Sequence, residues 1–349
     1  MAIVDRARLT QSVALLALFV ALSRSLTAHA ETAIHFTLDR KVDGPAAPFF
    51  LAIDKGYFKH EGLDVTIDAA SDGSPQAINR LATGKDDMGV VDINMLIKFR
   101  DVTKTPIKAV FVVFDKPPYA IIARKSRGIV APRDLPGKKL GAPSADPAFA
   151  QWPIFAKVNG IDGAKVGIEN IGLAVREPML ASGEVDAITG CPFTSYVDLK
   201  ARGVPVDDLV VLQMADYGLE LYGDAIVVAP RFAQDKPEAV RGFLRAYVKA
   251  LQDTVREPAR AVEAVLRRED TANKAVELER LRMAIDDNIV TAGVKVNGYG
   301  DIDPQRLAAS IDQLALAYSF RASDKAAGVF DRSFLPPPTV RGASAAVSR

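Results

Sequence analysis

Acidic side chains near the ends of predicted strands are the groups of this sequence best placed to bind a ligand. They are Asp39, Asp43, Asp92, Asp146 and Asp216, each in or next to a loop that follows an apolar run. An unpaired carboxylate in a closing cleft favours a partner with N–H donors, such as an amine, an amidine or an aminopyrimidine. Arg40 and Arg176 are close enough in sequence to neutralise some of these charges. The acidic set therefore indicates a nitrogen-containing ligand wherever a carboxylate stays unpaired.

Two serines offer the opposite chemistry. Ser74 and Ser144 begin predicted helices, and the free N–H groups of a helix N-terminus attract an anion such as nitrate or a sulfonate. Each serine taken alone is more simply explained as a helix N-cap. An anionic ligand thus stays open beside the nitrogen-containing one.

Aromatic side chains lie in or near the same segments. The candidates for stacking on a flat ligand are Phe49, Tyr119, Phe193, Tyr217 and Tyr222, with Trp152 as a further one. An offset ring pair gains about 0.5–1.5 kcal/mol beyond the burial of its area. Each of these rings is also explained by core packing, so they support a heteroaromatic ligand only as a group.

The chain carries no recognisable catalytic motif. Only His35 and His60 follow the first thirty residues, and the sequence contains no H-E-x-x-H, C-x-x-C, G-x-S-x-G or phosphate-binding loop. Cys191 is the single cysteine, which excludes an intramolecular disulfide. We therefore expect a binding protein with no cofactor and no catalytic or metal site. An exported enzyme that uses the aspartates is the alternative.

Strand and helix patterns alternate along the chain. Residues 34–38 and 63–67 alternate apolar and polar positions, which predicts strands, and a helix between them ends at Gly56. Further strands are predicted at 88–91, 109–114, 119–123, 140–141, 185–189, 209–212 and 225–229, after which the pattern is mainly helical. This predicts an α/β fold of two lobes, each a mostly parallel sheet flanked by helices. Lobe 1 would hold residues 31–124 plus 225–335, lobe 2 would hold 125–224, and 336–349 would form a disordered tail.

The first thirty residues have the pattern of a signal peptide. Arg6 and Arg8 precede an apolar run over 13–22, and Ala28-His29-Ala30 offers a cleavage site. We expect cleavage near Ala30 and export to the periplasm. The formal charge of +1, from 44 basic and 43 acidic residues without a basic stripe, gives no indication of nucleic-acid binding.

The segment PFFLAIDKGYFKHEGLDVTI, residues 48–67, resembles the opening of the NMT1/THI5-like and SsuA/TauA-like solute-binding proteins. That resemblance implies the type II periplasmic-binding-protein fold and a role in an ABC importer. A small-molecule ligand would be captured by hinge closure and released unchanged. The protein would be a monomer that docks peripherally on a membrane permease with its ATPase subunits. A periplasmic sensor that hands its bound form to a receptor is not distinguished from this role by sequence.

A second resemblance concerns the ligand. Residues 214–223, MADYGLELYG, resemble the D-Y-G-x-x-x-Y hinge segment of the thiamine-pyrimidine binders, which implies contacts from Asp216, Tyr217 and Tyr222. Two departures stand out. The lysine and histidine of the related pyrimidine synthases correspond to Val91 and Met95, and the tryptophan usual after the first strand is missing near Arg40. Thiamine-pyrimidine precursors lead the expected ligands, followed by aliphatic sulfonates, taurine and nitrate, and a ligand from outside both groups stays open.

Overall fold

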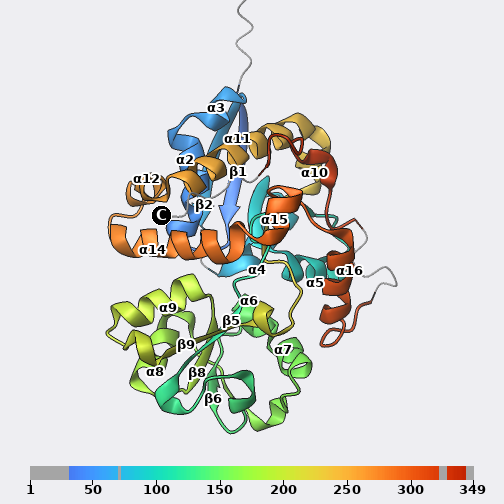
Figure 1. Ribbon diagram of the computed structural model, residues 1–349. Helices are drawn as coiled ribbons and strands as arrows, with labels where there is room; N and C mark the ends of the chain where they lie inside the picture. Colours follow the sequence, from blue (N-terminus) through green and yellow to red (C-terminus); the bar gives the residue numbers. More distant parts are fainter. Residues whose placement is uncertain (1–30, 70–71, 322–327, 343–349) are drawn as a thin grey trace, which may run out of the picture.

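Two five-stranded sheets, each flanked by helices, form two lobes (Figure 1). The computed structural model describes residues 31–69, 72–321 and 328–342. This architecture confirms the prediction of a two-lobed α/β fold with mostly parallel sheets. The predicted signal peptide, residues 1–30, lies outside the described residues.

The first sheet has the strand order β2-β1-β3-β10-β4. Its strands are β1 (Thr32–Leu38), β2 (Leu63–Ala69), β3 (Met88–Asp92), β4 (Lys108–Val112) and β10 (Asp224–Val228). Only β10 runs antiparallel to its neighbours, with Asp224 opposite Asp92 in the register. The carboxyl ends of the four parallel strands therefore meet at one edge of the sheet.

Helices cover both faces of the first sheet. They are α2 (Ala47–Asp54), α3 (Tyr57–His60), α4 (Gly73–Ala82), α5 (Ile93–Thr103), α10 (Pro230–Asp235), α11 (Pro237–Arg256), α12 (Pro258–Ala261), α13 (Glu263–Leu266), α14 (Lys274–Ala284), α15 (Ala292–Asn297) and α16 (Pro304–Leu314). Gly56, with φ at 68°, separates α2 from α3 as the sequence predicts, because glycine enters this region without strain. Phe36 stacks on Phe243 in the core between sheet and helices.

The second sheet repeats the pattern with the order β7-β6-β8-β5-β9. Its strands are β5 (Ala120–Arg124), β6 (Lys139–Gly141), β7 (Gly167–Glu169), β8 (Ala187–Gly190) and β9 (Leu209–Gln213). Its helices are α6 (Pro147–Ala150), α7 (Trp152–Val158), α8 (Arg176–Ser182) and α9 (Pro192–Ala201). Here β5 is the antiparallel strand. The edge strand β7 was not predicted, since its three residues are all exposed and carry no apolar alternation.

Two crossovers, residues 113–119 and 214–223, connect the lobes. They lie side by side, because the N–H groups of Val113 and Phe114 donate to the carbonyl of Asp224 (2.8 and 3.1 Å). The N–H of Gly223 in turn donates to the carbonyl of Phe114 at 3.0 Å. Since β5 belongs to the second sheet, the predicted lobe boundary at residue 124 lies one strand too late. A buried apolar strand gives no local indication of which sheet it joins.

Residues 336–342 differ from the predicted disordered tail. Arg341 is buried, and its guanidinium donates to the carbonyls of Pro336 (3.0 Å) and Asn297 (2.7 Å) and pairs with Asp301 (2.6 Å). This long-range pairing fixes a segment that its proline-rich composition alone would leave unstructured. The rest of the predicted tail, 343–349, lies outside the described residues. Within the described part of the chain, no helix combines the length and apolar composition needed to cross a bilayer.

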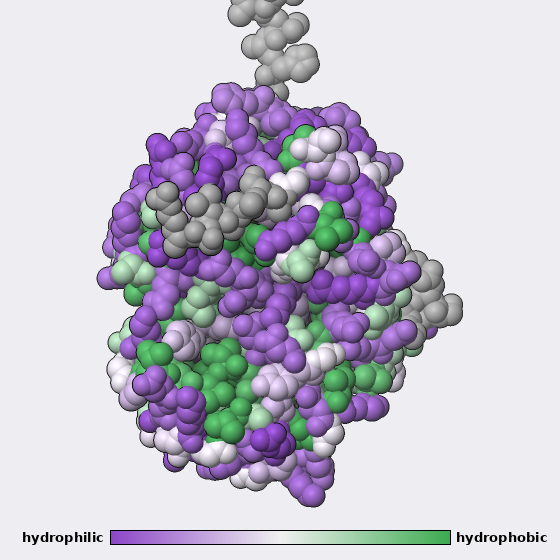
Figure 2. All heavy atoms as spheres, viewed as in Figure 1, coloured by the Kyte–Doolittle hydropathy of each residue, from purple (hydrophilic) through white to green (hydrophobic). Residues whose placement is uncertain are grey.

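The two lobes differ in surface character. In the view of Figure 2 the first lobe is mostly hydrophilic, whereas hydrophobic residues gather on part of the second lobe. Exposed hydrophobic side chains of the second lobe include Leu173 and Val175, in the turn before α8. Leu173 also lines the cavity between the lobes.

Candidate functional site

A cavity of about 510 Å³ lies where the carboxyl ends of strands from both sheets face each other. This is the usual place for a ligand in an open α/β sheet, and the volume falls in the usual range for small-molecule sites. Both lobes line it: Asp39, Arg40, Lys41, Asp43, Gly73 and Ser74 from the first, and Ala145, Asp146, Pro147, Leu173, Ala174, Arg176, Glu177, Cys191, Thr194, Asp198 and Arg202 from the second.

On the first lobe, Ser74 joins the ends of β1 and β3. Its hydroxyl donates to Oδ2 of Asp39 at 2.6 Å and accepts the N–H of Asp92 at 2.9 Å. Ser74 is the second residue of α4, whose N-cap position is Asp72, so it does not cap the helix. Its hydroxyl bonds to groups of the protein, so Ser74 is not the N-cap that the sequence favoured, and neither of these two bonds leaves it directed at an anion.

A buried network continues behind this wall. The Asp92 side chain caps α5 by accepting the N–H of Met95 at 2.8 Å, and it also accepts the hydroxyl of Tyr119. Burial raises the pKa of Asp92 to about 6. The side-chain amide of Asn94 donates to Tyr119 and to the carbonyl of Tyr222, both at 2.8 Å. These bonds hold the two crossovers against the first sheet.

Arg40 places a planar cation in the cavity wall. Its guanidinium pairs with Asp39 at 3.3 Å and with Asp224. It also lies over two aromatic rings, 5.2 Å from the centroid of Phe114 and 5.8 Å from that of Phe193. Carboxylates and rings together fix the plane of this side chain.

Asp43 is the cavity carboxylate with an unused oxygen. The residue is 3% exposed, and its Oδ1 has no hydrogen-bond partner among the described residues. Burial raises the pKa of Asp43 to about 6, against the opposing effect of Arg40. This oxygen is buried in the cavity wall, and a buried acceptor without a donor is unfavourable, so a ligand donor that reached it would satisfy it.

The wall of the second lobe is a closed ion-pair network. Arg176 donates to Glu177 at 2.9 Å and to Asp146 at 3.3 Å. The hydroxyls of Thr189 and Ser195 each add a bond of 2.7 Å, to Asp146 and Glu177 respectively. Each of these charged groups has a partner within the protein, and the network of one cation and two carboxylates keeps one negative charge.

The structure brings some of the predicted site residues together and disperses others. Asp39, Asp43, Ser74 and Asp146 line the cavity. Asp92 and Tyr119 lie in the buried network behind it. Phe193 faces Arg40, and Phe49 packs in the first-lobe core against Phe36 and Tyr247.

The remaining four predicted residues also lie outside the cavity lining, and their side chains are exposed or contact other elements. Ser144 is exposed, and the cap of α6 is Asp146 instead. Asp216 is exposed and pairs with Lys116 at 2.7 Å. Tyr217 packs edge-on against Phe155, and the hydroxyl of Tyr222 accepts the N–H of Asp303 at 2.9 Å. The hinge segment turns these side chains toward α7 and α16.

Sequence reasoning did not include several cavity residues among its site candidates. Glu177, Asp198 and Arg202 lie on α8 or in or directly after α9. Adjacent opposite charges at the start of a predicted helix, as in Arg176-Glu177, were the one available signal.

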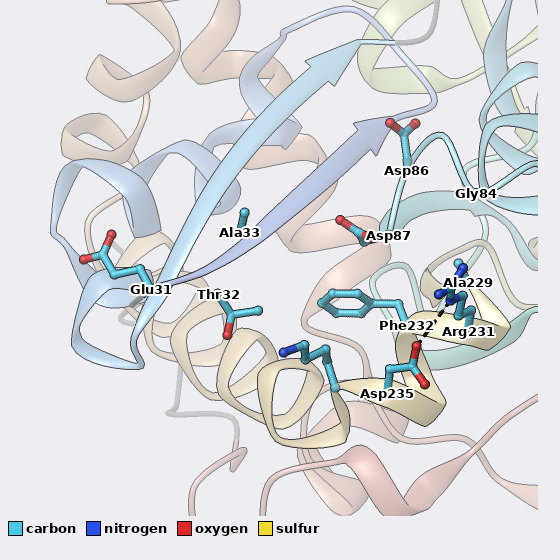
Figure 3. Close-up of a pocket in the computed structure, with 11 residues that line it drawn as sticks. Glu31, Thr32, Ala33, Gly84, Asp86, Asp87, Ala229, Arg231, Phe232 and Asp235 are labelled. Atoms are coloured by element: carbon cyan, nitrogen blue, oxygen red, sulfur yellow. Dashed lines mark hydrogen bonds and ion pairs between the residues drawn. The ribbon is translucent and has the colours of Figure 1, made fainter. Parts of the chain in front are cut away.

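A second cavity, of about 490 Å³, lies at the opposite edge of the first sheet (Figure 3). Glu31 and Thr32, at the start of β1, line it, whereas Asp39 follows the end of that strand. Arg231 and Asp235 on its border pair with each other at 3.3 Å. Because it lies at the amino ends of parallel strands, the cavity between the lobes is the stronger candidate.

Proteins of known name match part of this sequence. Riboflavin-binding protein RibY of Chloroflexus aurantiacus is 26% identical over 223 residues, which cover 63% of this chain and 62% of that protein. The 4-amino-5-hydroxymethyl-2-methylpyrimidine phosphate synthase of Aspergillus parasiticus is 28% identical over 228 residues, covering 62% and 65%. The chain thus spans less than two thirds of the length of either relative.

The fold is that of periplasmic binding proteins. The aliphatic sulphonate binding protein SsuA of Escherichia coli superposes with a TM-score of 0.68 at 16% identity, over 85% of this chain and 96% of that one. A sequence profile of the family described as NMT1/THI5 like matches residues 45–261, more than half of the chain. The chain therefore belongs to the NMT1/THI5-like family.

Proposed function

We propose that this protein is the periplasmic solute-binding component of an ABC importer. It captures a small nitrogen-containing solute between its lobes by hinge closure and passes it unchanged to a membrane permease with its ATPase. The observation that carries the proposal is the cavity between the lobes, because residues of both lobes line it and paired crossovers join the two lobes. Such a hinge permits closure with little change inside either lobe.

The preference for a nitrogen-containing solute depends on Asp43. Asp39, Asp92 and Asp146 are paired within the protein, and Asp216 pairs with Lys116. Of the aspartates near strand ends, Asp43 is therefore the one that still supports a nitrogen-containing ligand, because its buried Oδ1 has no donor among the described residues. An amino or ring N–H of the ligand would satisfy that oxygen.

A flat ligand is supported by Arg40 more than by the aromatic residues first considered. A guanidinium can stack on a heteroaromatic ring, and Arg40 lines the cavity beside the rings of Phe114 and Phe193. The names of the two relatives, a riboflavin-binding protein and a pyrimidine phosphate synthase, both involve heteroaromatic rings. A thiamine-pyrimidine precursor or a related ring is thus the leading ligand class. Sulfonates, taurine and nitrate are the competing outcomes.

The experiment is a thermal-shift screen of residues 31–349 against pyrimidines, riboflavin, aliphatic sulfonates, taurine and nitrate. A ligand at 100 times its dissociation constant adds about 2.7 kcal/mol of stability. Asp43→Asn should reduce the shift given by a heterocycle, whereas Asp235→Asn, in the other cavity, should not. A shift with sulfonates or nitrate alone would contradict the proposed ligand class.

Cys191 gives a second measurement. It lines the cavity, it is the only cysteine, and burial raises the pKa of its thiol to about 12, so alkylation should be slow. A ligand between the lobes should slow the alkylation further.

Mass spectrometry of the ligand recovered from the protein tests whether the ligand is released unchanged, as the import role requires. A converted ligand would support the alternative of an exported enzyme with Asp43 as its base.

A further inference from the structure

Helix α14 of the first lobe and helix α9 of the second face each other along one side of the cleft (Figure 1). Arg280 on α14 pairs with Asp198 on α9, and Asp198 also lines the cavity. The Arg280 side chain is 7% exposed and that of Asp198 28%. Lys200 and Glu279 form a second pair between these helices at 2.8 Å, with both side chains more exposed.

Arg280 is also tied to the loop that carries Asp43. Its Nη1 donates to Oε1 of Glu277 at 2.8 Å, and Oε2 of Glu277 accepts the N–H of Gly44 at 2.7 Å. Gly44 lies so close to α14 that an added Cβ would be 2.1 Å from the carbonyl oxygen of Glu277. The loop and α14 therefore move as one body.

From these contacts we infer that Arg280 couples occupation of the cavity to closure of the lobes. The Glu277 and Gly44 contacts lie within the first lobe and persist when the lobes separate. The pair with Asp198 crosses the cleft, so separation of α9 from α14 would break it. An interaction made in one of two states shifts their equilibrium, so this pair stabilises the closed form. A ligand donor on Asp43 holds the loop, and Glu277 holds Arg280 in position for Asp198.

This inference rests on the proposed function, and Asp198→Asn tests it. The variant leaves the pair of Arg280 with Glu277 intact and removes only the charge across the cleft. We expect the ligand-free protein to have a larger radius of gyration by small-angle X-ray scattering. We also expect the dissociation constant of the best compound from the screen to rise about tenfold, the loss of one charge-assisted bond.

Three further variants define the result. Glu279→Gln, which breaks the more exposed pair, should change affinity less than about twofold, since surface ion pairs contribute little. Asp198→Glu should recover most of the affinity, and Arg280→Lys, which loses the forked geometry, should open the protein as Asp198→Asn does.

Two outcomes would overturn the coupling. One is unchanged affinity and scattering in Asp198→Asn. The other is a loss of affinity with scattering identical to the wild type, which would make Asp198 a ligand contact only. If no compound binds the wild type, the proposed function fails separately, and ligand-free scattering still decides whether the pair closes the lobes.

Discussion

Replacing Gly190 by alanine tests how the second-lobe wall of the cavity is held. The Cβ of an alanine would lie 2.6 Å from Oγ of Ser195 and 3.2 Å from Nη1 of Arg176. Ser195 is fully buried, and its hydroxyl donates to Glu177 at 2.7 Å. The added methyl group would force that hydroxyl to rotate away. Glu177 would then lose one of its donors inside the protein.

The magnitude follows from the bond that is lost. A hydrogen bond to a charged group contributes about 1.5–3 kcal/mol, so Gly190→Ala should lower the free energy of unfolding by about that amount. Urea unfolding followed by circular dichroism measures it. The control is Gly163→Ala in the same lobe, where an added Cβ meets no atom of the described residues within 4 Å. That change should alter stability by less than about 0.5 kcal/mol.

A double-mutant cycle separates this mechanism from a general loss of packing. Ser195→Ala removes the atom that the new methyl group would strike. Gly190→Ala should therefore cost clearly less when it is added to Ser195→Ala than in the wild type, and the remaining cost should come from the 3.2 Å approach to Nη1 of Arg176. Strictly additive effects would refute the reasoning, because they would show that the two positions do not act through the same contact.

Three other changes have definite expected results. The pKa of Asp43 in the folded protein, about 6, lies above its ordinary value of 3.8, so the folded state holds more protons between these values and stability falls as pH rises through them. Asp43→Asn should therefore raise the melting temperature at pH 7.5, by the equivalent of up to about 3 kcal/mol, and not at pH 3.5. Arg40→Met should destabilise the protein by about 3 kcal/mol because it leaves Asp224 buried and unpaired, and adding Asp224→Asn should recover part of that loss in the same unfolding assay. Gly44→Ala should lower the yield of folded protein in purification, because its Cβ would strike the backbone of Glu277, which cannot rotate away.

The sequence predicted those parts of the fold that depend on local pattern. The alternation in residues 34–38 and 63–67 placed β1 and β2, and Gly56 marked the end of α2. The sheet to which β5 belongs could not be predicted, because its membership is decided by pairing with β8 and β9, far along the chain. The three exposed residues of β7 gave no pattern at all.

The candidate site was predicted in part for the same reason. Loops after strands indicated the region where the cavity between the lobes lies, since parallel strands bring their carboxyl ends to one edge. The sequence could not show which charged side chains form ion pairs in the folded protein. Arg40 and its partner Asp224 are 184 residues apart, and Arg176 and Asp146 are 30 residues apart. Ion pairing is a property of the folded chain.

The pairing pattern changes the argument about the ligand. If all five strand-end aspartates were free, the cavity would favour any cation through its overall charge. Because Arg40 and Arg176 compensate their neighbours, the preference is reduced to a single directed acceptor, Oδ1 of Asp43. A directed acceptor selects for the position of an N–H group on the ligand more than for its net charge. Neutral aminopyrimidines should therefore bind better than simple alkylammonium ions of the same size, and calorimetric titration of such a pair against wild type and Asp43→Asn measures the difference. Equal affinity of the two ligand types for the wild type would show that overall charge, and not the Asp43 oxygen, determines binding.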